Sequence, residues 1–307
     1  MSAVSIADVS DTARWVAYFR GIESARPDRL FNDRFALRLA GKRGRAIAES
    51  MPKGPLPWSL AVRTRVFDEL ITATIESDGV DLVLNLAAGL DVRPYRLALP
   101  PKLHWVEVDL PSILDEKTNL LAGEQPACAV ERVGLDLADA VARRELFARV
   151  GTQAKRVLIV SEGLLAYLDE ATVGSLADEL RRSMPDSRWL LENVAPDVLA
   201  RLKQNWDARL EAGNATMKFA PAKGLGFFED RGWHTRTTRS LLDEAERLDR
   251  EMPIVKLTRW VGRWVPPISH AYARRQAKLR DKVVYALLDT YAESAGVRCH
   301  EALGKHS

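Results

Sequence analysis

The residues best suited to chemistry are a turn of small residues and an acid that follows it along the chain. The turn, Ala87-Ala88-Gly89, comes directly after the apolar run Leu82–Leu86. Small residues let the backbone approach a ligand closely. Asp109 ends a second apolar run 20 residues after Gly89, a distance at which a carboxylate can accept hydrogen bonds from ribose hydroxyls. The pair therefore predicts a nucleoside-binding site.

Each half of this pair also has a plain structural explanation. The turn lacks a GxGxxG pattern, so it could join a strand to a helix without binding a ligand. Asp109 could instead cap the helix expected to begin near Pro111 by accepting its backbone N–H groups. We favour the ribose role, and we prefer Asp109 to Glu107 because it lies nearer the end of its strand.

Two further acids follow later apolar runs. Asp136 lies where its carboxylate could accept a hydrogen bond from an adenine amino group while Leu137 covers the ring, although a helix cap explains it equally well. Glu162 follows the run that ends at Ser161 and precedes Gly163, so it should face the same site. A carboxylate at that position could pair with an ammonium group of the ligand.

The residues after the turn separate two kinds of nucleoside cofactor. Dinucleotide-dependent oxidoreductases place a pyrophosphate at a helix N-terminus behind a glycine-rich loop. We expect Asp91 in the first turn of that helix, where it would repel a phosphate. S-adenosyl-L-methionine carries no phosphate, so Asp91 favours it over NAD. An NAD-dependent oxidoreductase remains an alternative, as does a non-catalytic binding protein that retains the fold, for which Ala87 is the only indication.

The elements that must position these residues are apolar runs alternating with amphipathic segments. Seven strands are predicted, at residues 82–86, 103–109, 129–133, 156–161, 188–193, 233–238 and 283–288. Helices are predicted between them, at residues 93–99, 111–122, 137–150, 170–184 and 241–248. This alternation is typical of an α/β fold with a mainly parallel sheet and helices on both faces. Ligands of such sheets lie beyond the carboxyl ends of the strands.

The chain before the first strand has a helical pattern. Residues 12–48 and 58–76 carry apolar positions at helical spacing, and the proline-rich stretch 51–57 should separate them as a linker or lid. We therefore expect three parts, which are a helical N-terminal cover at 1–78, a cofactor-binding core at 79–250, and a basic C-terminal extension with a lid and the closing strand at 251–307.

Composition narrows the class of protein. A chain of 307 residues with 47% hydrophobic and 28% charged residues has the profile of an ordinary globular enzyme. The net charge of +3 is too small to indicate a polyanionic partner. Cys128 and Cys299 form no metal-binding or disulfide pattern, which favours a reducing cytoplasm. We expect no secretory signal at residues 1–11 and no membrane span, because no apolar stretch is long enough.

Taken in order, these motifs resemble the leucine carboxyl methyltransferase family, including its bacterial branch of S-adenosylmethionine-dependent O-methyltransferases linked to secondary metabolism. The resemblance covers Asp11 to about Pro253. Its carriers are residues 10–13 (SDTA), 29–33 (RLFND), 62–65 (VRTR), 86–97 (LAAGLDVRPYRL), 107–111 (EVDLP) and 162–168 (EGLLAYL). The resemblance implies a Rossmann-like class I methyltransferase fold.

The resemblance also implies a role for each matching residue. Arg63 should bind the methionine carboxylate of S-adenosylmethionine, and Glu162 should bind its ammonium group. The remaining contacts should come from the turn Ala87 to Gly89 beneath the methionine portion, Asp109 at the ribose, and Asp136 with Leu137 at the adenine. The family's usual loop is LGAG, so the methyl group of Ala87 narrows the space for the cofactor.

The acceptor follows less directly from the sequence. Transfer of a sulfonium methyl is an in-line displacement, so the main task of the enzyme is to hold the nucleophile, the carbon and the sulfur close to a line. A carboxylate acceptor needs no base at neutral pH, whereas an alcohol or phenol does. The Asn/Asp-Pro-Pro-Tyr/Phe tetrad of many amino-methylating enzymes is absent after the fourth strand, which favours an oxygen acceptor. We expect a carboxylate or acidic hydroxyl of a small molecule, with Tyr167 and His234 as candidate contacts; a surface strand position is the preferred reading of His234.

The basic segment 256–282 is the other candidate for contact with a partner. It contains Trp260, Trp264 and Tyr272 around Pro266-Pro267. A lid over the acceptor pocket and ordinary helix packing are the preferred interpretations, ahead of docking to an acidic carrier protein or to a membrane. We expect no metal and no nucleic-acid partner, and the sequence leaves the oligomeric state open.

Overall fold

The computed structural model describes residues 9–50, 56–210, 216–251, 255–257, 260, 274 and 277–291. Three helices come first, α1 (Val9–Ser24), α2 (Ala36–Ser50) and α3 (Leu56–Asp78). The strands are β1 (Leu82–Leu86), β2 (His104–Asp109), β3 (Ala129–Gly134), β4 (Val157–Ser161), β5 (Ser187–Val194), β6 (His234–Ser240) and β7 (Val283–Asp289). The other elements are α4 (Arg93–Arg96), α5 (Pro111–Leu120), α6 (Ala140–Gln153), α7 (Glu170–Ser183), α8 (Pro196–Leu210), α9 (Gly226–Glu229), α10 (Leu241–Arg247) and the 3-10 turns η1 (Leu165–Tyr167) and η3 (Arg280–Lys282).

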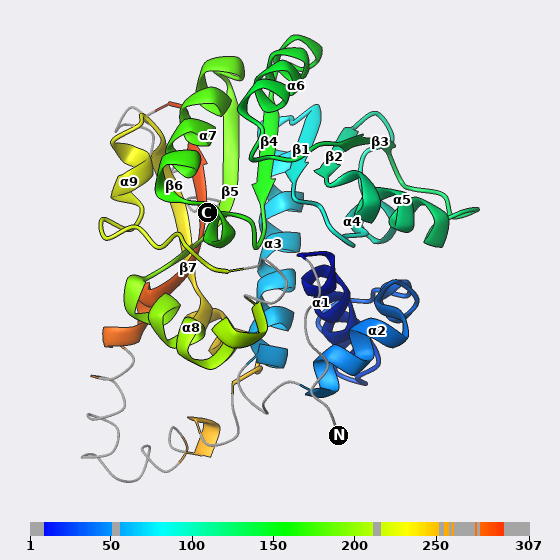
Figure 1. The fold of residues 1–307 in the computed structure, drawn as a ribbon, viewed down its shortest axis with the longest axis vertical. Coiled ribbons are helices and arrows are strands. Elements are labelled where there is room, and N and C mark those ends of the chain that lie inside the picture. The colour runs from blue at the N-terminus through cyan, green and yellow to red at the C-terminus, as the bar shows by residue number, and fades with distance from the viewer. Residues whose placement is uncertain are drawn as a thin grey trace, which may run out of the picture.

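The seven strands form one sheet in the order β3-β2-β1-β4-β5-β7-β6 (Figure 1). Strands β1 to β5 run parallel, and β7 is antiparallel to both β5 and β6. The chain adds β2 and β3 on one side of β1 and then β4 and β5 on the other. This reversal makes the carboxyl ends of β1 and β4 the expected ligand-binding edge. The predicted mainly parallel, seven-stranded sheet is confirmed.

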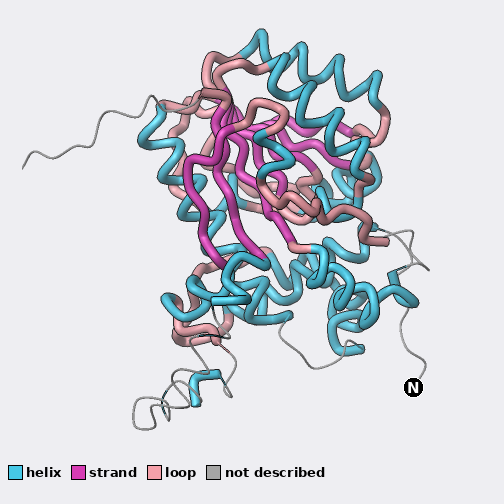
Figure 2. The backbone as a smooth tube through the Cα atoms, turned by 90° about the vertical axis from the view of Figure 1, so that its left-hand side faces the viewer, coloured by secondary structure: helices cyan, strands magenta, loops and turns pink. Residues whose placement is uncertain are grey.

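Alternate residues of the central strands face two apolar layers, so helices cover both sides of the sheet (Figure 2). On one side Leu84 of β1 packs in a cluster with Phe147 of α6 and Leu176 of α7. On the other side Val83 belongs to a cluster with Phe67 of α3. Burial of such a side chain contributes about 1.5–3 kcal/mol. All five residues of β1 are buried, which suits the strand that carries the turn.

Most predicted strand bounds agree with the structure to within one or two residues, and the helix bounds differ more. Residues 12–48 divide into α1 and α2, with residues 25–35 between them. Helix α6 begins at Ala140 rather than at 137, because the Asp139 side chain accepts the N–H groups that open it. Leu56 and Pro57 of the expected linker belong to α3, where proline in the first turn is tolerated. Residues 51–55 lie outside the described part.

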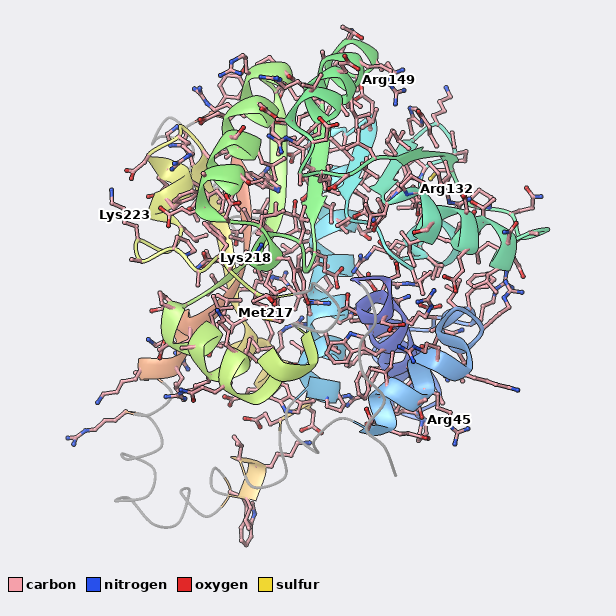
Figure 3. All side chains as sticks on the ribbon, in the orientation of Figure 1. Arg45, Arg132, Arg149, Met217, Lys218 and Lys223 are labelled. Carbon is pink, nitrogen blue, oxygen red and sulfur yellow. The ribbon has the colours of Figure 1, made fainter. Side chains whose placement is uncertain are left out.

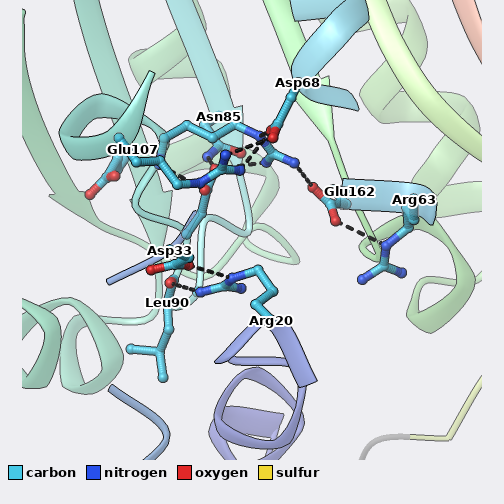
Figure 4. Close-up of polar contacts among 12 residues, drawn as sticks. Arg20, Asp33, Arg63, Asp68, Asn85, Leu90, Glu107 and Glu162 are labelled. Atoms are coloured by element: carbon cyan, nitrogen blue, oxygen red, sulfur yellow. Dashed lines mark hydrogen bonds and ion pairs between the residues drawn. The ribbon is translucent and has the colours of Figure 1, made fainter. Parts of the chain in front are cut away.

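The helices α1 and α2 lie beyond the end of the sheet to which the parallel strands point (Figure 1). Arg20 of α1 is buried; its Nε donates to Asp33 Oδ2 at 2.9 Å and its Nη2 donates to the carbonyl of Leu90 at 2.5 Å (Figure 4). The bond to Leu90 attaches α1 to the loop that follows β1, and the bond to Asp33 attaches α1 to the segment that precedes α2. Within the described ranges, none of the helices has both the length and the apolar character that crossing a membrane requires.

Candidate functional site

The turn after β1 has an unusual backbone. Ala87 and Gly89 both lie in the left-handed region, with φ of 54° and 46°. A Cβ on residue 89 would lie 3.2 Å from the Cβ of Ala13 in α1, so this position requires glycine. The left-handed conformation costs a residue with a Cβ about 1–2 kcal/mol. Ala87 therefore adds strain where the family's usual residue would add none.

Asp109 joins the end of β2 to this turn. Its Oδ2 accepts the N–H of Gly89 at 2.6 Å, and its Oδ1 accepts the N–H of Leu110 at 2.7 Å. Burial raises the pKa of Asp109, and this effect outweighs the two backbone N–H groups that lower it. No side chain caps the start of α5. Asp109 therefore connects the ends of β1 and β2 and does not cap α5, which was the alternative role.

Glu162, directly after β4, lies between two arginines. Arg63 of α3 donates from Nε to its Oε1 at 2.9 Å, and Arg93 of α4 places Nη2 at 2.7 Å from its Oε2 (Figure 4). The Nη1 of Arg63 also donates to Glu192 Oε2 of β5 at 3.1 Å. Burial raises the pKa of Glu162, but the two guanidinium groups lower it further, below its ordinary value. Glu162 is therefore an anion at neutral pH.

Arg93 extends the network to the other side of the turn. Its Nε donates to Asp68 of α3 at 2.7 Å, and its Nη1 donates to Asp91 at 2.9 Å. Arg96 also donates to Asp68, at 2.6 Å for each of its two Nη atoms. The Arg93 side chain is only 3% exposed. These contacts give a continuous chain of ion pairs from α4 through Glu162 to β5.

The prediction for Asp91 is corrected by this arrangement. Asp91 lies two residues before α4 rather than in its first turn, and its Oδ1 accepts the N–H of Arg93 at 3.0 Å. Asn85 also donates to it, at 3.0 Å. Burial raises the pKa of Asp91, but Arg93 and other nearby cations lower it well below its ordinary value. Because Arg93 balances its charge, Asp91 would repel a phosphate less strongly than its position in the sequence indicates.

Asp136 and Leu137 occupy the loop between β3 and α6. Asp136 is exposed, and its Oδ1 accepts the N–H of Ala138 at 2.9 Å. The cap of α6 is Asp139, so the helix-cap alternative for Asp136 is wrong. Leu137 is buried in the apolar cluster that contains α6 and α7. The adenine contact of Asp136 and Leu137 remains a prediction.

The two candidate acceptor contacts lie far apart in the fold. Tyr167 ends η1, close to the network, where burial is the main cause that raises the pKa of its hydroxyl. His234 is exposed and begins β6, opposite Asp289, which pairs with Arg188 at the amino end of β5. The site lies at the carboxyl ends of the strands. The candidate contact role of His234 is therefore wrong, and the alternative of a surface strand residue holds.

Sequence reasoning missed two members of the site. Arg93 was part of the motif at residues 86–97 but received no role, because its partners Asp68 and Glu162 are distant in sequence. Glu192 interrupts the apolar end of β5, between Leu191 and Asn193. An acid at the end of a buried strand is a signal that could have identified it.

The arrangement can bind a zwitterion next to a nucleoside. Arg63 and Glu162 offer a cation and an anion at the end of β4, and Nη2 of Arg63 has no carboxylate partner among the residues that the structure describes. Asp109 offers a carboxylate two strands away. The same part of the chain contains no group of three His, Cys, Asp or Glu side chains placed to hold a metal ion. The charge pattern therefore matches an amino acid joined to a ribose.

Comparison with solved structures agrees with this geometry. A DUF574 family protein from Streptomyces avermitilis superposes with a TM-score of 0.60 at 14% identity, covering 91% of this chain and 97% of that one. A protein from Thermobifida fusca that is provisionally named a methyltransferase superposes with a TM-score of 0.57 at 17% identity, covering 87% and 95%. At these identities the likeness concerns the fold, which is that of class I methyltransferases.

Sequence comparison identifies the family. The model of the leucine carboxyl methyltransferase family matches residues 13–181. A relative from Parafrankia sp. (strain EAN1pec), provisionally named an S-adenosyl-L-methionine-dependent methyltransferase, is 34% identical over 81% of this chain and 85% of its own length. A relative from Mycobacteroides abscessus with the same provisional name is 29% identical over 81% and 90%. The chain therefore belongs to the leucine carboxyl methyltransferase family, as its motifs indicate.

Proposed function

We propose that this enzyme methylates a carboxylate or acidic hydroxyl oxygen of a small molecule, in secondary metabolism. Family membership makes it an S-adenosylmethionine-dependent methyltransferase rather than an NAD-dependent oxidoreductase or a binding protein without catalysis. The observation that carries the placement of the site is the Arg63–Glu162 pair at the carboxyl end of β4. It offers one positive and one negative group to an amino-acid moiety.

The residues present fit the cofactor. We propose that Arg63 binds the methionine carboxylate and Glu162 the ammonium group, because guanidinium and carboxylate groups form strong charge-assisted hydrogen bonds with these partners. The turn Ala87 to Gly89 would pass beneath the methionine, and Asp109 would hold the ribose. The hydrogen bond from the N–H of Gly89 to Asp109 Oδ2 at 2.6 Å keeps the turn beside this carboxylate, which supports a ligand that contacts both. Asp136 and Leu137 would contact the adenine.

The chemistry needs little from the protein beyond orientation. When bound, S-adenosylmethionine supplies an activated methyl group on a sulfonium sulfur. Arg63 and Glu162 would fix the amino-acid end and Asp109 the ribose, so that the sulfur lies between two held ends. The role of these residues would be to keep the methyl group in line with the acceptor oxygen while water is excluded. A carboxylate acceptor requires no proton transfer, whereas a hydroxyl acceptor must give up its proton.

An apolar wall near Tyr167 supports an acceptor with an apolar body. Tyr167, Phe19 and Met217 pack against a buried cluster that contains Trp15, and the ring centroids of Trp15 and Phe19 are 6.1 Å apart at an interplanar angle of 75°. Met217, in the loop before α9, is labelled in Figure 3. Tyr167 would contact the acceptor from this wall. Aromatic side chains bury large apolar areas, which suits a cyclic or aliphatic acid.

Segment 256–282 remains a proposed lid or packing element. Trp264, Pro266, Pro267 and Tyr272 lie outside the described residues. At its ends Lys256 pairs with Asp249 at 2.6 Å and Lys282 with Asp197 at 2.9 Å, while Trp260 is 61% exposed. We propose no nucleic-acid partner and rank carrier-protein or membrane contact behind the lid. A reducing compartment such as the cytoplasm is supported by Cys128, a buried free thiol.

Two arginines on α3 provide a matched test of cofactor binding. Calorimetric titration with S-adenosylhomocysteine should show binding to the wild type, and Arg63→Met should weaken it at least about 10-fold. Arg65→Met is the control, because Arg65 pairs with Glu69 on the same helix and is 41% exposed. Absence of binding to the wild type, or equal effects of the two variants, would contradict the proposed site.

The acceptor is tested by measuring S-adenosylhomocysteine released from S-adenosylmethionine with matched compounds. Benzoic acid, phenol and aniline derivatives of one ring skeleton differ only in the accepting group. We expect release with the carboxylate or the acidic phenol and none with the amine. Release with the amine alone would refute the oxygen acceptor while leaving the cofactor site intact.

A further inference from the structure

Arg93 is a buried arginine to which the proposed function gives no part in cofactor binding. Its side chain is 3% exposed, and each of its three nitrogens faces a different carboxylate. Nε donates to Asp68 at 2.7 Å, Nη1 donates to Asp91 at 2.9 Å, and Nη2 lies 2.7 Å from Glu162. Because so little of its surface is accessible, we expect Arg93 to act on a ligand through these acids rather than by direct contact.

Two of these contacts join Arg93 to the pair that is proposed to bind the methionine portion. Arg63 and Asp68 both belong to α3. Glu162, after β4, contacts Arg63 on one side and Arg93 of α4 on the other. Arg93 in turn contacts Asp68, which brings the connection back to α3 (Figure 4). The four side chains therefore form a closed ring that fixes Glu162 relative to α3.

The contact between Arg63 and Glu162 uses only part of each group. One hydrogen bond joins them, from Nε to Oε1 at 2.9 Å, although arginine and carboxylate groups frequently pair through two parallel hydrogen bonds. The second oxygen, Oε2, lies 2.7 Å from Arg93, and Nη2 of Arg63 has no carboxylate partner in the described part of the chain. Arg93 thus holds the oxygen that could otherwise turn to Nη2. Each carboxylate oxygen can accept a further hydrogen bond, so Glu162 can still accept an ammonium group.

Arg93 also favours the anionic form of Glu162. Burial raises the pKa of Glu162, and of the two guanidinium groups that lower it Arg93 acts more strongly than Arg63. Asp91 raises this pKa, but Asp91 is itself paired with Arg93. Without Arg93, the guanidinium of Arg63 would remain beside Glu162, and both oxygens of the acid could turn to it.

We propose that Arg93 is a positioning residue that holds Oε2 of Glu162 and so prevents this acid from pairing with Arg63 through both oxygens. The inference rests on the proposed binding of the methionine carboxylate at Arg63 and of the ammonium group at Glu162. With Arg93 in place, each member of the pair keeps a hydrogen-bonding position for the opposite charge of the ligand. Without Arg93, the two members neutralise each other, and the ligand must separate them before it binds.

A double-mutant cycle measures whether Arg93 acts through Glu162. Calorimetric titration with S-adenosylhomocysteine should show a loss of affinity of about 10-fold or more for Arg93→Met and for Glu162→Gln. The double variant should bind no more than about 3-fold more weakly than Glu162→Gln, because the acid through which Arg93 acts is already absent. No loss in Arg93→Met, or an equal loss in both backgrounds, refutes the proposal. Failure of the wild type to bind would instead refute the proposed cofactor site.

A second arginine separates this role from a general loss of stability. Arg188, 17% exposed near the amino end of β5, pairs with Asp78 and Asp186 far from the site. Arg188→Met should unfold at a lower temperature than the wild type but keep its affinity for S-adenosylhomocysteine to within about 3-fold. If it loses as much affinity as Arg93→Met, the effect of Arg93 is one of stability alone and the proposal is wrong.

Crystal structures without ligand test the geometry directly. In Arg93→Met both oxygens of Glu162 should contact Arg63, whereas a Glu162 that keeps its single bond contradicts the proposal. If Arg93→Met does not fold, the cycle is repeated with Arg93→Lys, which keeps the positive charge and should show a smaller loss. That loss must still disappear in the Glu162→Gln background; its persistence there refutes the proposal.

Discussion

The replacement of Arg93 by methionine tests the ionic network most severely. Arg93 is 3% exposed and lies within 2.9 Å of Asp68, Asp91 and Glu162. Methionine fills much of the same space and removes the charge. Removal of one partner from a buried ion pair costs about 3–5 kcal/mol. Because Asp68 and Glu162 each keep a second arginine, we expect a loss of about 4 kcal/mol in the free energy of unfolding, near the middle of that range.

The stability lost in Arg93→Met should decrease as the pH falls. In the wild type the pKa values of Asp91 and Glu162 are lowered, because Arg93 and the other nearby cations together outweigh the burial that raises them. Groups with a lowered pKa stabilise the folded state above their ordinary pKa of about 4 and lose that contribution as the pH falls. The difference between wild type and Arg93→Met should therefore be largest at neutral pH and shrink below about pH 4. Urea unfolding at pH 7 and at pH 4 measures both values.

Two other variants complete this experiment. Arg93→Lys keeps the positive charge but loses the planar guanidinium group that contacts three carboxylates. Its free energy of unfolding should therefore lie between those of Arg93→Met and the wild type. Arg65→Met removes an exposed i,i+4 pair and should cost less than about 1 kcal/mol. The reasoning is refuted if Arg93→Met is no less stable than Arg65→Met, or if its deficit grows on acidification.

Two further substitutions test the turn and the acid that faces it. Asp109→Asn should lower the free energy of unfolding by about 1–3 kcal/mol, because the amide accepts only through Oδ1 and leaves the N–H of Gly89 or of Leu110 without an acceptor. It should also weaken S-adenosylhomocysteine binding about 10- to 100-fold through lost ribose hydrogen bonds; a variant with the stability and the affinity of the wild type would contradict both statements. Ala87→Gly should raise the free energy of unfolding by about 1 kcal/mol, because Ala87 has φ of 54°. Urea unfolding of this variant and of the control Ala88→Gly measures the effect, and the control should lose stability. If both variants lose stability, Ala87 is not strained.

The sheet could be predicted because its strands carry local signals. The central strands β1 and β4 are short, fully buried and mostly apolar runs, and alternation with helices limits how strands can pair. The prediction was weaker where local signals compete. A helix start at 137 was predicted with Asp136 as a possible cap, but Asp139 caps α6, and the sequence does not distinguish these two acids. Helices α8 and α9 were not predicted.

The site could be predicted only in part, since its members meet through the fold. Asp109 and the turn were found because a fixed number of residues separates them, and the structure joins them by a hydrogen bond of 2.6 Å. Arg63 was assigned through the family's motif, while its contact with Glu192 comes from elements 129 residues apart. Asp91 was misjudged because Arg93, which neutralises it, received no role in the sequence analysis. Charge balance is a property of the assembled site.

The place of β7 in the sheet also determines the order in which the chain can fold. β6 pairs with β7, and β7 begins 89 residues after the end of β5. On the ribosome, β5 therefore remains an open edge and β6 has no neighbour until Val283 and the residues after it have emerged. Open strand edges pair readily with other chains, and long-range pairing is slow. Until then a chain with the β3-β2-β1-β4-β5 part formed would expose the edge of β5, which is the part of the sheet most prone to aggregation.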